Sequence, residues 1–265
     1  DKVREGVEVR ILCDGMGGRF MPKKRWDQMR SAGIKVGVFF PPFLGWLNLR
    51  VNYRNHRKIV VVDGAAGFVG GFNIGREYIS RDPKFGYWRD THLEIKGEAA
   101  ISLQIRFALD WNYVTGENLF KEIRYFGEEA EYARRRLNGQ IHAVWPDPDH
   151  VNEMVCMQII TSGPDTREPH IRNNYLELFH KAKHHIYIQT PYFIPDDAIF
   201  SSLKIAALSG VDVRLMIPCK PDHPFVYWAT CSYAGELLDY GARVYVYENG
   251  FLHSKGIMID GRGSC

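Results

Sequence analysis

Cysteines, clustered metal ligands and targeting signals are scarce in this sequence of 265 residues. The five cysteines are odd in number, widely scattered and without a C-x-x-C pair. This excludes a disulfide-rich secreted scaffold and a zinc-binding module, and it favours a reducing environment. No clustered set of His, Cys, Asp and Glu indicates a metal site, so we expect neither a metal nor a cofactor.

Long apolar runs are also missing. A helix that crosses a membrane needs about eighteen apolar residues, and the nearest candidate, residues 36–49 (VGVFFPPFLGWLNL), is interrupted by two prolines and a glycine. No signal peptide opens the chain. Because the sequence begins with Asp and stops just after a predicted strand, we expect a fragment whose membrane anchor lies outside it.

The sequence also lacks a large excess of positive or negative charge. The sequence has 34 Lys and Arg against 31 Asp and Glu, a net charge of +3, and its pI is near 8.5. This balance permits an anionic partner without identifying it, and we do not expect nucleic acid. Hydrophobic residues make up 45% and charged residues 25% of the chain, which is typical of a globular protein.

What the sequence does contain is one motif in two copies. Residues 55–63 (NHRKIVVVD) and 252–260 (LHSKGIMID) both carry His-x-Lys-x-x-x-x-Asp. Around the two copies, residues 6–12 (GVEVRIL) resemble 210–216 (GVDVRLM), and residues 29–39 (MRSAGIKVGVF) resemble 237–247 (LLDYGARVYVY). The same order of segments occurs twice, which indicates an internal repeat.

The predicted elements alternate between strand and helix. In the second copy we predict strands at 154–161, 185–190 and 210–216, and helices at 170–185 and 196–210, the latter capped by Asp and ended by Gly210. This predicts an α/β fold of two pseudo-symmetric halves, each a mixed β-sheet flanked by helices, with the active site at their interface. The expected domains are residues 1–111 (N-terminal part missing), a connecting segment at 112–150 with one helix at 127–137, and residues 151–265 (C-terminal part missing).

Side chains alternate between the two faces of a strand, so the His and Lys of each motif share one face and the Asp points to the other. The pairs are His56 with Lys58 and His253 with Lys255, and the opposed aspartates are Asp63 and Asp260. We expect both aspartates to have a structural role, binding backbone or a basic side chain. If the halves bring the pairs together, four groups that can carry positive charge meet, and a phosphate suits the space between them.

These groups suit a phosphodiester reaction without a metal. One imidazole can attack phosphorus and form a phosphohistidine, while the other protonates the leaving alcohol and deprotonates the incoming one. Asp90, in a predicted strand at 88–95 (WRDTHLEI), is the best-placed carboxylate to orient the nucleophilic histidine, although a surface pair with Arg89 stays open. The amide of Asn73, which follows Gly70 and Gly71, can hydrogen-bond a phosphate oxygen.

These segments resemble the phospholipase D superfamily, and within it the bacterial cardiolipin synthases. The doubled motif and the glycine-rich stretch after it carry the first resemblance. Residues 190–197 (TPYFIPDD), 220–230 (KPDHPFVYWAT) and 247–255 (YENGFLHSK) carry the second. The resemblance implies transfer of a phosphatidyl group from one phosphatidylglycerol to another, with release of glycerol, through a phosphohistidine.

The resemblance also implies roles for the site residues and a cellular setting. The implied roles are His56 as nucleophile, His253 as acid and base, Lys58, Lys255, Asn73 and Gly71 at the phosphate, and Asp90 as the carboxylate that orients the first histidine. The implied partners are anionic phospholipid and the membrane surface. The implied location is the cell membrane, with the catalytic domain facing the cytoplasm.

Two segments leave open how lipid is contacted. The loop 39–54, with aromatic residues beside Arg50 and Arg54, either inserts at the membrane interface or lies buried beneath the site. Residues 223–238 (HPFVYWATCSYAGELL) either contact acyl chains or form helix core, but Tyr227 and Trp228 cannot both face inward.

Three other functions compete with phosphatidyl transfer. A phosphodiester hydrolase would use the same residues with water as the acceptor. A metal-independent nuclease would favour a strongly basic groove, and the net charge of +3 argues against it. A non-catalytic anion-binding module would be expected to lack a histidine or lysine of the motifs, whereas all four are present.

Overall fold

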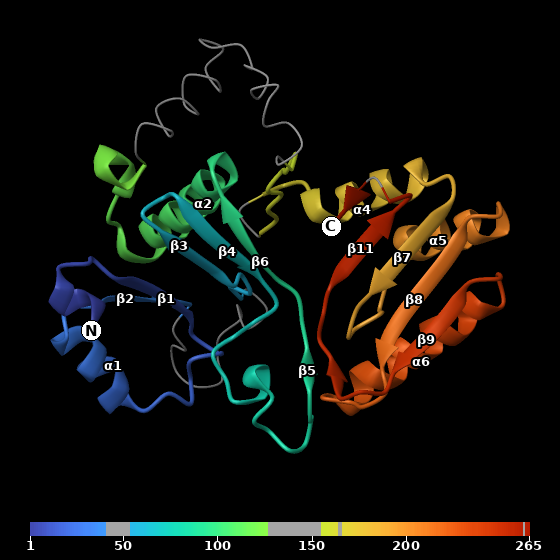
Figure 1. Cartoon of the computed structure of the whole chain (residues 1–265), viewed down its shortest axis with the longest axis horizontal. Helices are drawn as coiled ribbons and strands as arrows, with labels where there is room; N and C mark the ends of the chain where they lie inside the picture. The colour runs from blue at the N-terminus through green and yellow to red at the C-terminus, as the bar shows by residue number, and fades with distance from the viewer. Residues whose placement is uncertain (41–53, 127–154, 164–165, 262) are drawn as a thin grey trace, which may run out of the picture. The chain divides into compact units, whose positions relative to one another are not determined.

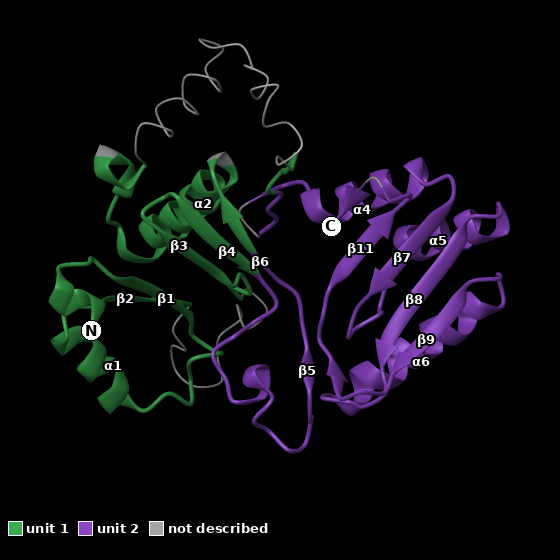
Figure 2. Ribbon diagram, in the orientation of Figure 1, with its two compact units in different colours: residues 1–69, 94–159 green, residues 70–93, 160–265 purple. Residues whose placement is uncertain are grey.

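The computed structural model describes residues 1–40, 54–126, 155–163, 166–261 and 263–265. They form two compact units, which we call unit 1 (residues 1–69 and 94–159) and unit 2 (residues 70–93 and 160–265; Figures 1 and 2). The predicted α/β class is confirmed. The division differs from the predicted domain boundaries, because residues 70–93 follow the first motif in sequence but make their contacts within unit 2.

Unit 1 contains two small sheets and one long helix. β1 (Arg10–Asp14) and β2 (Lys35–Phe39) pair in parallel, and α1 (Lys23–Ser31) connects them. The second sheet has the order β3-β4-β6, in which β3 (Ile59–Val62) is antiparallel to β4 (Ala66–Gly70) and β6 (His92–Lys96) follows. α2 (Glu98–Thr115) contacts β2 and β3. Short 3-10 helices lie at Lys2–Glu5, Leu119–Lys121 and Ile123–Tyr125.

Unit 2 is built on a five-stranded sheet in the order β12-β11-β7-β8-β9. β7 (His185–Gln189), β8 (Asp212–Pro218) and β9 (Arg243–Tyr247) are parallel; β11 (Gly256–Ile259) is antiparallel to β7, and β12 (Gly263–Ser264) is antiparallel to β11. The helices are α4 (His170–Lys181), α5 (Asp197–Leu208) and α6 (Pro224–Leu238), with a 3-10 turn η2 at Glu77–Ile79. The two-residue strands β5 (Trp88–Arg89) and β10 (Phe251–Leu252) pair in parallel.

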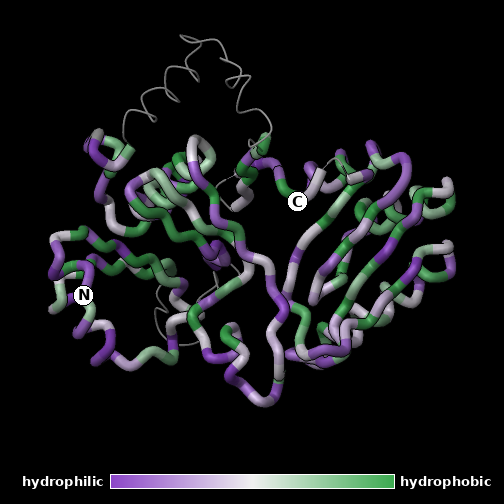
Figure 3. The backbone as a smooth tube through the Cα atoms, viewed as in Figure 1, coloured by the Kyte–Doolittle hydropathy of each residue, from purple (hydrophilic) through white to green (hydrophobic). Residues whose placement is uncertain are grey.

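Alternating burial orients the strands of unit 2. Ile186 and Ile188 of β7 are buried, as are Val213, Leu215 and Ile217 of β8, while the residues between them are partly exposed. Figure 3 shows this alternation of apolar and polar residues along the strands. The buried residues share one core with buried side chains of α4, α5 and α6. Three helices therefore cover this face of the sheet.

The ends of α5 fall where the sequence predicts them, whereas α4 ends at Lys181, before the predicted end at residue 185. The Asp196 carboxylate accepts the N–H of Ile199 at 2.9 Å and so caps α5. Gly210 after α5 and Gly241 after α6 have φ of 89° and 90°, a left-handed conformation that glycine adopts without a steric penalty. Each of these turns leads directly into a strand of the sheet.

The two units repeat each other in strand register. Arg10 of β1 pairs with Lys35 of β2, and Arg214 of β8 pairs with Arg243 of β9, which are the equivalent positions of the repeat. β3 and β11 each begin directly after the lysine of their motif, and each ends directly before the motif aspartate. That aspartate has φ of 53° in the first copy and 52° in the second. The internal repeat is therefore visible in the backbone.

Three local predictions are wrong. Residues 155–161, predicted as part of a strand, form none; Val155 is 81% exposed, and the strand that pairs with the outer side of β11 is β12. The predicted strand at 6–12 begins only at Arg10. The predicted strand at 88–95 is divided into β5 and β6, and Asp90 lies in the break.

Two other predictions concern residues outside the described ranges. They are the helix at 127–137 and most of the loop at 39–54. Within the described residues, no helix combines the length and the apolar character that crossing a bilayer requires.

Candidate active site

Two aspartates of unit 1 bind the residues at the start of the first motif. The Asp14 carboxylate accepts hydrogen bonds from Arg54 (3.0 and 2.8 Å) and from the N–H of Asn55 (3.1 Å). Asp110 of α2 is 3% exposed and accepts from the Arg57 guanidinium at 3.1 Å and from the Asn55 amide at 3.4 Å. Residues 55 and 57 thus bind helix α2.

The residues that alternate with Asn55 and Arg57 in the sequence are the His and Lys of the first motif, His56 and Lys58. The Lys58 ammonium donates to the backbone oxygen of His56 at 2.7 Å, so the lysine folds back along the histidine. His56 itself is exposed.

Hydrogen bonds join the second motif to residues 88–91 within unit 2. β10 pairs with β5, and the N–H groups of His253 and Ser254 both donate to the Arg89 oxygen, at 2.8 and 3.0 Å. The hydroxyls of Thr91 and Ser254 are 2.6 Å apart and hydrogen-bonded. Ser254 is 1% exposed, so this contact is buried.

Asp90 contacts the imidazole of the second motif. Asp90 Oδ2 is 2.7 Å from His253 Nδ1, and Asp90 Oδ1 accepts the N–H of Thr91 at 2.8 Å. The sequence had assigned Asp90 to the first histidine, and this assignment is corrected to His253. The reason is tertiary: the β5–β10 pairing places Asp90 beside the second motif.

The environment of this pair sets its protonation. Burial on its own raises the pKa of the Asp90 carboxyl, but hydrogen bonds from His253 and Thr91 and the charge of Lys255 outweigh it, so the pKa lies below its usual value. An ionised Asp90 accepts the Nδ1–H of the imidazole, which directs the Nε2 lone pair away from the carboxylate. His253 can then exchange a proton through Nε2.

Aromatic rings enclose this imidazole. Four ring centroids lie within 4.9 to 6.4 Å of that of His253, and they belong to Trp88, Tyr78, Phe251 and Tyr192. His253 is only 6% exposed. Exclusion of water strengthens the electrostatic interactions among the remaining polar groups.

Lys255 lies against the same imidazole. Its ammonium donates to the His253 backbone oxygen at 2.8 Å, the same contact that Lys58 makes with His56. The ammonium is also 3.2 Å from Nδ1 and 3.1 Å from Nε2. The in-plane directions of these two nitrogens diverge, so one ammonium near both lies against the ring face rather than along either direction. Burial lowers the pKa of Lys255 to about 8, while the charges of Asp90 and Asp222 act in the opposite direction.

Gly71 and Asn73, the residues predicted to bind phosphate, make contacts within unit 2. The N–H of Gly71 donates to the Thr91 oxygen at 3.0 Å. A Cβ at Gly71 would lie 2.0 Å from Asp90 Oδ1, so this glycine leaves room for the carboxylate. Asn73 is exposed and its amide donates to the Tyr78 hydroxyl at 2.8 Å.

The motif aspartates end their strands. Asp260 accepts the N–H groups of Lys183, His184 and His185 at 2.9, 2.9 and 2.8 Å. These backbone hydrogen bonds lower the pKa of Asp260 to about 2. Asp63 adopts the same left-handed backbone conformation at the equivalent turn of unit 1. The Asp260 carboxylate is thus used in joining β11 to the start of β7.

Sequence reasoning missed four residues around the motifs. Tyr192 and Asp222 lie beside Lys255, Tyr78 and Trp88 lie beside His253, and none of them had been assigned a role. Tyr192 and Asp222 do fall in segments that carried the family resemblance. That coincidence was the available signal, but a single sequence does not indicate which side chain of such a segment turns toward the motif.

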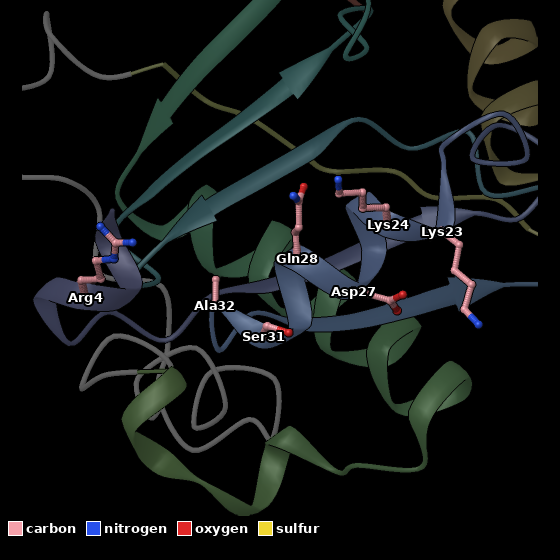
Figure 4. A pocket seen from close by; sticks show the side chains of 7 residues that line it. All are labelled: Arg4, Lys23, Lys24, Asp27, Gln28, Ser31 and Ala32. Atoms are coloured by element: carbon pink, nitrogen blue, oxygen red, sulfur yellow. The ribbon is translucent and has the colours of Figure 1, made fainter.

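A separate hollow lies on unit 1. It measures about 640 Å³ and lies along α1, with Arg4 from the first 3-10 helix (Figure 4). Four of the seven residues that line it are charged, and none belongs to a motif. Within the part of the chain that the structure describes, no group of three His, Cys, Asp or Glu side chains is arranged to hold a metal ion.

The fold is that of a phospholipase D-like protein. The chain superimposes on phosphatidylserine synthase from Haemophilus influenzae Rd KW20 with a TM-score of 0.61 and 16% sequence identity, over 98% of this chain and 66% of that one. At this identity the likeness concerns the fold alone. The family model described as "Cardiolipin synthase, PLD-like domain" matches residues 1–97 and 175–264. The chain therefore belongs to this family.

Curated relatives agree with that assignment. The chain is 48% identical to the major cardiolipin synthase ClsA of Bacillus subtilis over 264 residues and 51% identical to cardiolipin synthase 2 of Staphylococcus epidermidis over 260 residues. Each match covers 98% of this chain, but 50% and 49% of the relative. The chain thus spans about half the length of the curated relatives it matches.

Proposed function

We propose that this chain is the catalytic part of a cardiolipin synthase, which transfers a phosphatidyl group between two phosphatidylglycerol molecules and releases glycerol. The observation that carries the proposal is the buried His253, with Asp90 at Nδ1 and Lys255 against the ring. This is the arrangement that proton transfer at a phosphodiester requires. The first copy of the motif supplies another imidazole, His56, for covalent catalysis, and the similarity to named cardiolipin synthases supports the substrate class.

The reaction proceeds in two balanced steps. In the first step, a His56 nitrogen forms a bond to phosphorus while the bond from phosphorus to the oxygen of the headgroup glycerol breaks. His253 gives its Nε2 proton to that oxygen. In the second, His253 takes the proton from the hydroxyl of another phosphatidylglycerol, whose oxygen displaces His56. Asp90 stabilises the imidazolium form that His253 has before the first transfer and after the second, and the motif lysines bind the non-bridging oxygens.

The first test follows the lipid products. The protein is incubated with phosphatidylglycerol vesicles, and lipids and free glycerol are measured by mass spectrometry beside His56→Ala. Cardiolipin with an equal amount of glycerol, absent from the variant, is expected. Phosphatidic acid as the main product assigns the hydrolase alternative instead, since water then replaces the acceptor alcohol. No lipid turnover by the folded protein contradicts both.

The order of the two histidines is tested with an activated substrate. A p-nitrophenyl phosphodiester has a leaving group that needs no proton, so an acid catalyst becomes dispensable in the first step. His253→Ala is then expected to retain a burst of nitrophenol and a covalent phosphohistidine, whereas His56→Ala loses both. The opposite pattern assigns the nucleophile to His253.

The proposal includes an anionic membrane surface as partner, and one face of α6 fits it. Phe225 and Trp228 are 81% and 62% exposed, and their rings contact each other edge to face at 5.5 Å. They lie just after Asp222, which accepts a hydrogen bond from Tyr192, the residue whose ring lies beside Lys255. Lys220 and His223 nearby are exposed, and residues 223–235 contain no acidic side chain. Exposed aromatic rings beside basic groups suit the interface of an anionic bilayer.

Phe225→Ala is expected to weaken sedimentation with phosphatidylglycerol vesicles about tenfold, because burying an aromatic side chain in the interface contributes roughly 1.5 kcal/mol or more. Phe20→Ala is the matched control, since Phe20 is equally exposed at 81% but lies in unit 1 far along the sequence from α6. Equal binding of Phe225→Ala and the unaltered protein contradicts this contact.

A further inference from the structure

Tyr192 and Asp222 form a pair beside the second motif that the proposed reaction does not use. Tyr192 follows β7 and Asp222 follows β8, at the carboxyl ends of neighbouring parallel strands. The Tyr192 hydroxyl donates to Asp222 Oδ2, and the N–H of His223 donates to Asp222 Oδ1 at 2.7 Å. Both oxygens of this carboxylate are therefore engaged.

The backbone around Tyr192 is also fixed by hydrogen bonds. The N–H of Tyr192 donates to the Thr190 hydroxyl at 3.2 Å, and the N–H of Phe193 donates to the Thr230 hydroxyl of α6 at 3.1 Å. Thr230 and Phe193 are buried. Burial and the hydrogen bond to Asp222 keep the Tyr192 phenol protonated, since both raise its pKa. The phenol thus acts as a fixed donor.

The Tyr192–Asp222 pair contacts the second motif through Lys255. The Lys255 ammonium is 5.9 Å from the centroid of the Tyr192 ring, within the range of a cation–π contact, and the same ring lies edge-on to His253 at 6.4 Å. Asp222 is one of two carboxylates whose charge acts on Lys255; the other is Asp90. Among the described residues, the charged and titratable groups around this ammonium are Asp90, His253 and Tyr192, with Asp222 bound to the Tyr192 hydroxyl.

We propose that Tyr192 and Asp222 are positioning residues for Lys255: the ring supports the ammonium against the imidazole, and the carboxylate keeps it protonated. A buried lysine loses its proton readily, and burial lowers the pKa of Lys255 to about 8. Asp90 is already engaged with His253, so a second carboxylate on the Tyr192 side secures the charge of the lysine. Only the catalytic consequence of this assignment rests on the proposed function.

The direct test is the titration of Lys255 by NMR in the chain labelled with ¹⁵N-lysine, with Lys255→Arg to assign the signal. The unaltered chain is expected to titrate near pH 8. Asp222→Asn keeps the partner of the Tyr192 hydroxyl but removes the charge, and it is expected to lower the midpoint by about one unit or more. Asp222→Glu restores the charge and should restore the midpoint. Asp239→Asn, at the exposed end of α6, should leave it unchanged.

Tyr192→Leu provides the second variant, and it replaces Asp222→Asn if that variant fails to fold. Loss of the ring and of the hydroxyl donor is expected to lower the Lys255 midpoint as well. An unchanged midpoint in both folded variants overturns the assignment. Because these titrations need no lipid turnover, they stand or fall independently of the proposed reaction.

The kinetic readout separates positioning from general structural damage. When Lys255 loses its proton at lower pH, the alkaline limb of kcat/KM for phosphatidyl transfer moves to lower pH by the same amount in Asp222→Asn, while the rates at lower pH converge with those of the unaltered protein. A variant that is merely distorted loses activity at every pH. A uniform loss therefore contradicts the assignment even where the fold is retained.

Discussion

Asp90→Asn is expected to lower the rate of phosphatidyl transfer by a factor on the order of a thousand or more. The ionised carboxylate accepts the Nδ1–H of His253 at 2.7 Å. An asparagine amide can present N–H instead, which makes Nδ1 an acceptor and leaves the proton on Nε2, the wrong tautomer for a base. The same exchange beneath a catalytic histidine costs about ten thousandfold in serine proteases.

The measurement is kcat with phosphatidylglycerol vesicles at neutral pH, beside Asp239→Asn as a control of the same chemistry at an exposed site in unit 2. The melting temperature is recorded for both, because Asp90 is also a buried hydrogen-bond acceptor. A loss of less than tenfold in folded Asp90→Asn contradicts the role assigned to the Asp90–His253 pair.

Gly250→Ala is expected to lower the melting temperature by about 10 °C and to abolish activity. Gly250 has φ of 102°, and a Cβ there would lie 2.0 Å from the Tyr87 oxygen and 2.8 Å from its carbonyl carbon. These are backbone atoms of the segment that pairs with β10, so the two strands must separate. The strained φ and the clash together cost roughly 4 kcal/mol, and a domain of this size loses about 2–4 °C per kcal/mol.

The loss of activity follows from the same displacement. The N–H of Phe251 donates to the Tyr87 oxygen at 2.8 Å, and two residues later His253 meets Asp90. Moving β10 from β5 therefore separates imidazole from carboxylate. Gly235→Ala is the control: no atom lies within 4 Å of its Cβ position in α6, and alanine there is expected to be neutral or slightly stabilising. Equal melting temperatures for the two variants contradict the close approach at Gly250.

Much of unit 2 was predictable because its signals are local. Asp196 at the start of α5 and Gly210 and Gly241 at the helix ends act within a few residues of their own positions. The alternation of buried and partly exposed residues along β7 and β8 is an equally local signal, because one face of each strand is buried. The segment 155–161 failed for the complementary reason: its apolar residues resemble a strand, but strand formation depends on a partner elsewhere in the chain.

The partner of Asp90 was not predictable from local pattern. Asp90 and His253 are separated by 163 positions. The position of Asp90 soon after the first motif suggested that it serves the first histidine, whereas residues 70–93 belong by their contacts to unit 2. Tyr192 and Asp222 share this limitation, because they meet only where the ends of two parallel strands lie side by side.

The sequence by itself determined the repeat, the two His–Lys pairs and the class of fold, because motif spacing and periodic burial are properties of neighbouring residues. Only the tertiary structure decided which carboxylate serves which histidine and which groups surround Lys255. The physical reason is that pKa, tautomer and water exclusion depend on contacts within about 6 Å. In unit 2 those contacts come from four segments, around residues 78–91, 192, 222 and 251–255, that are brought together by strand pairing.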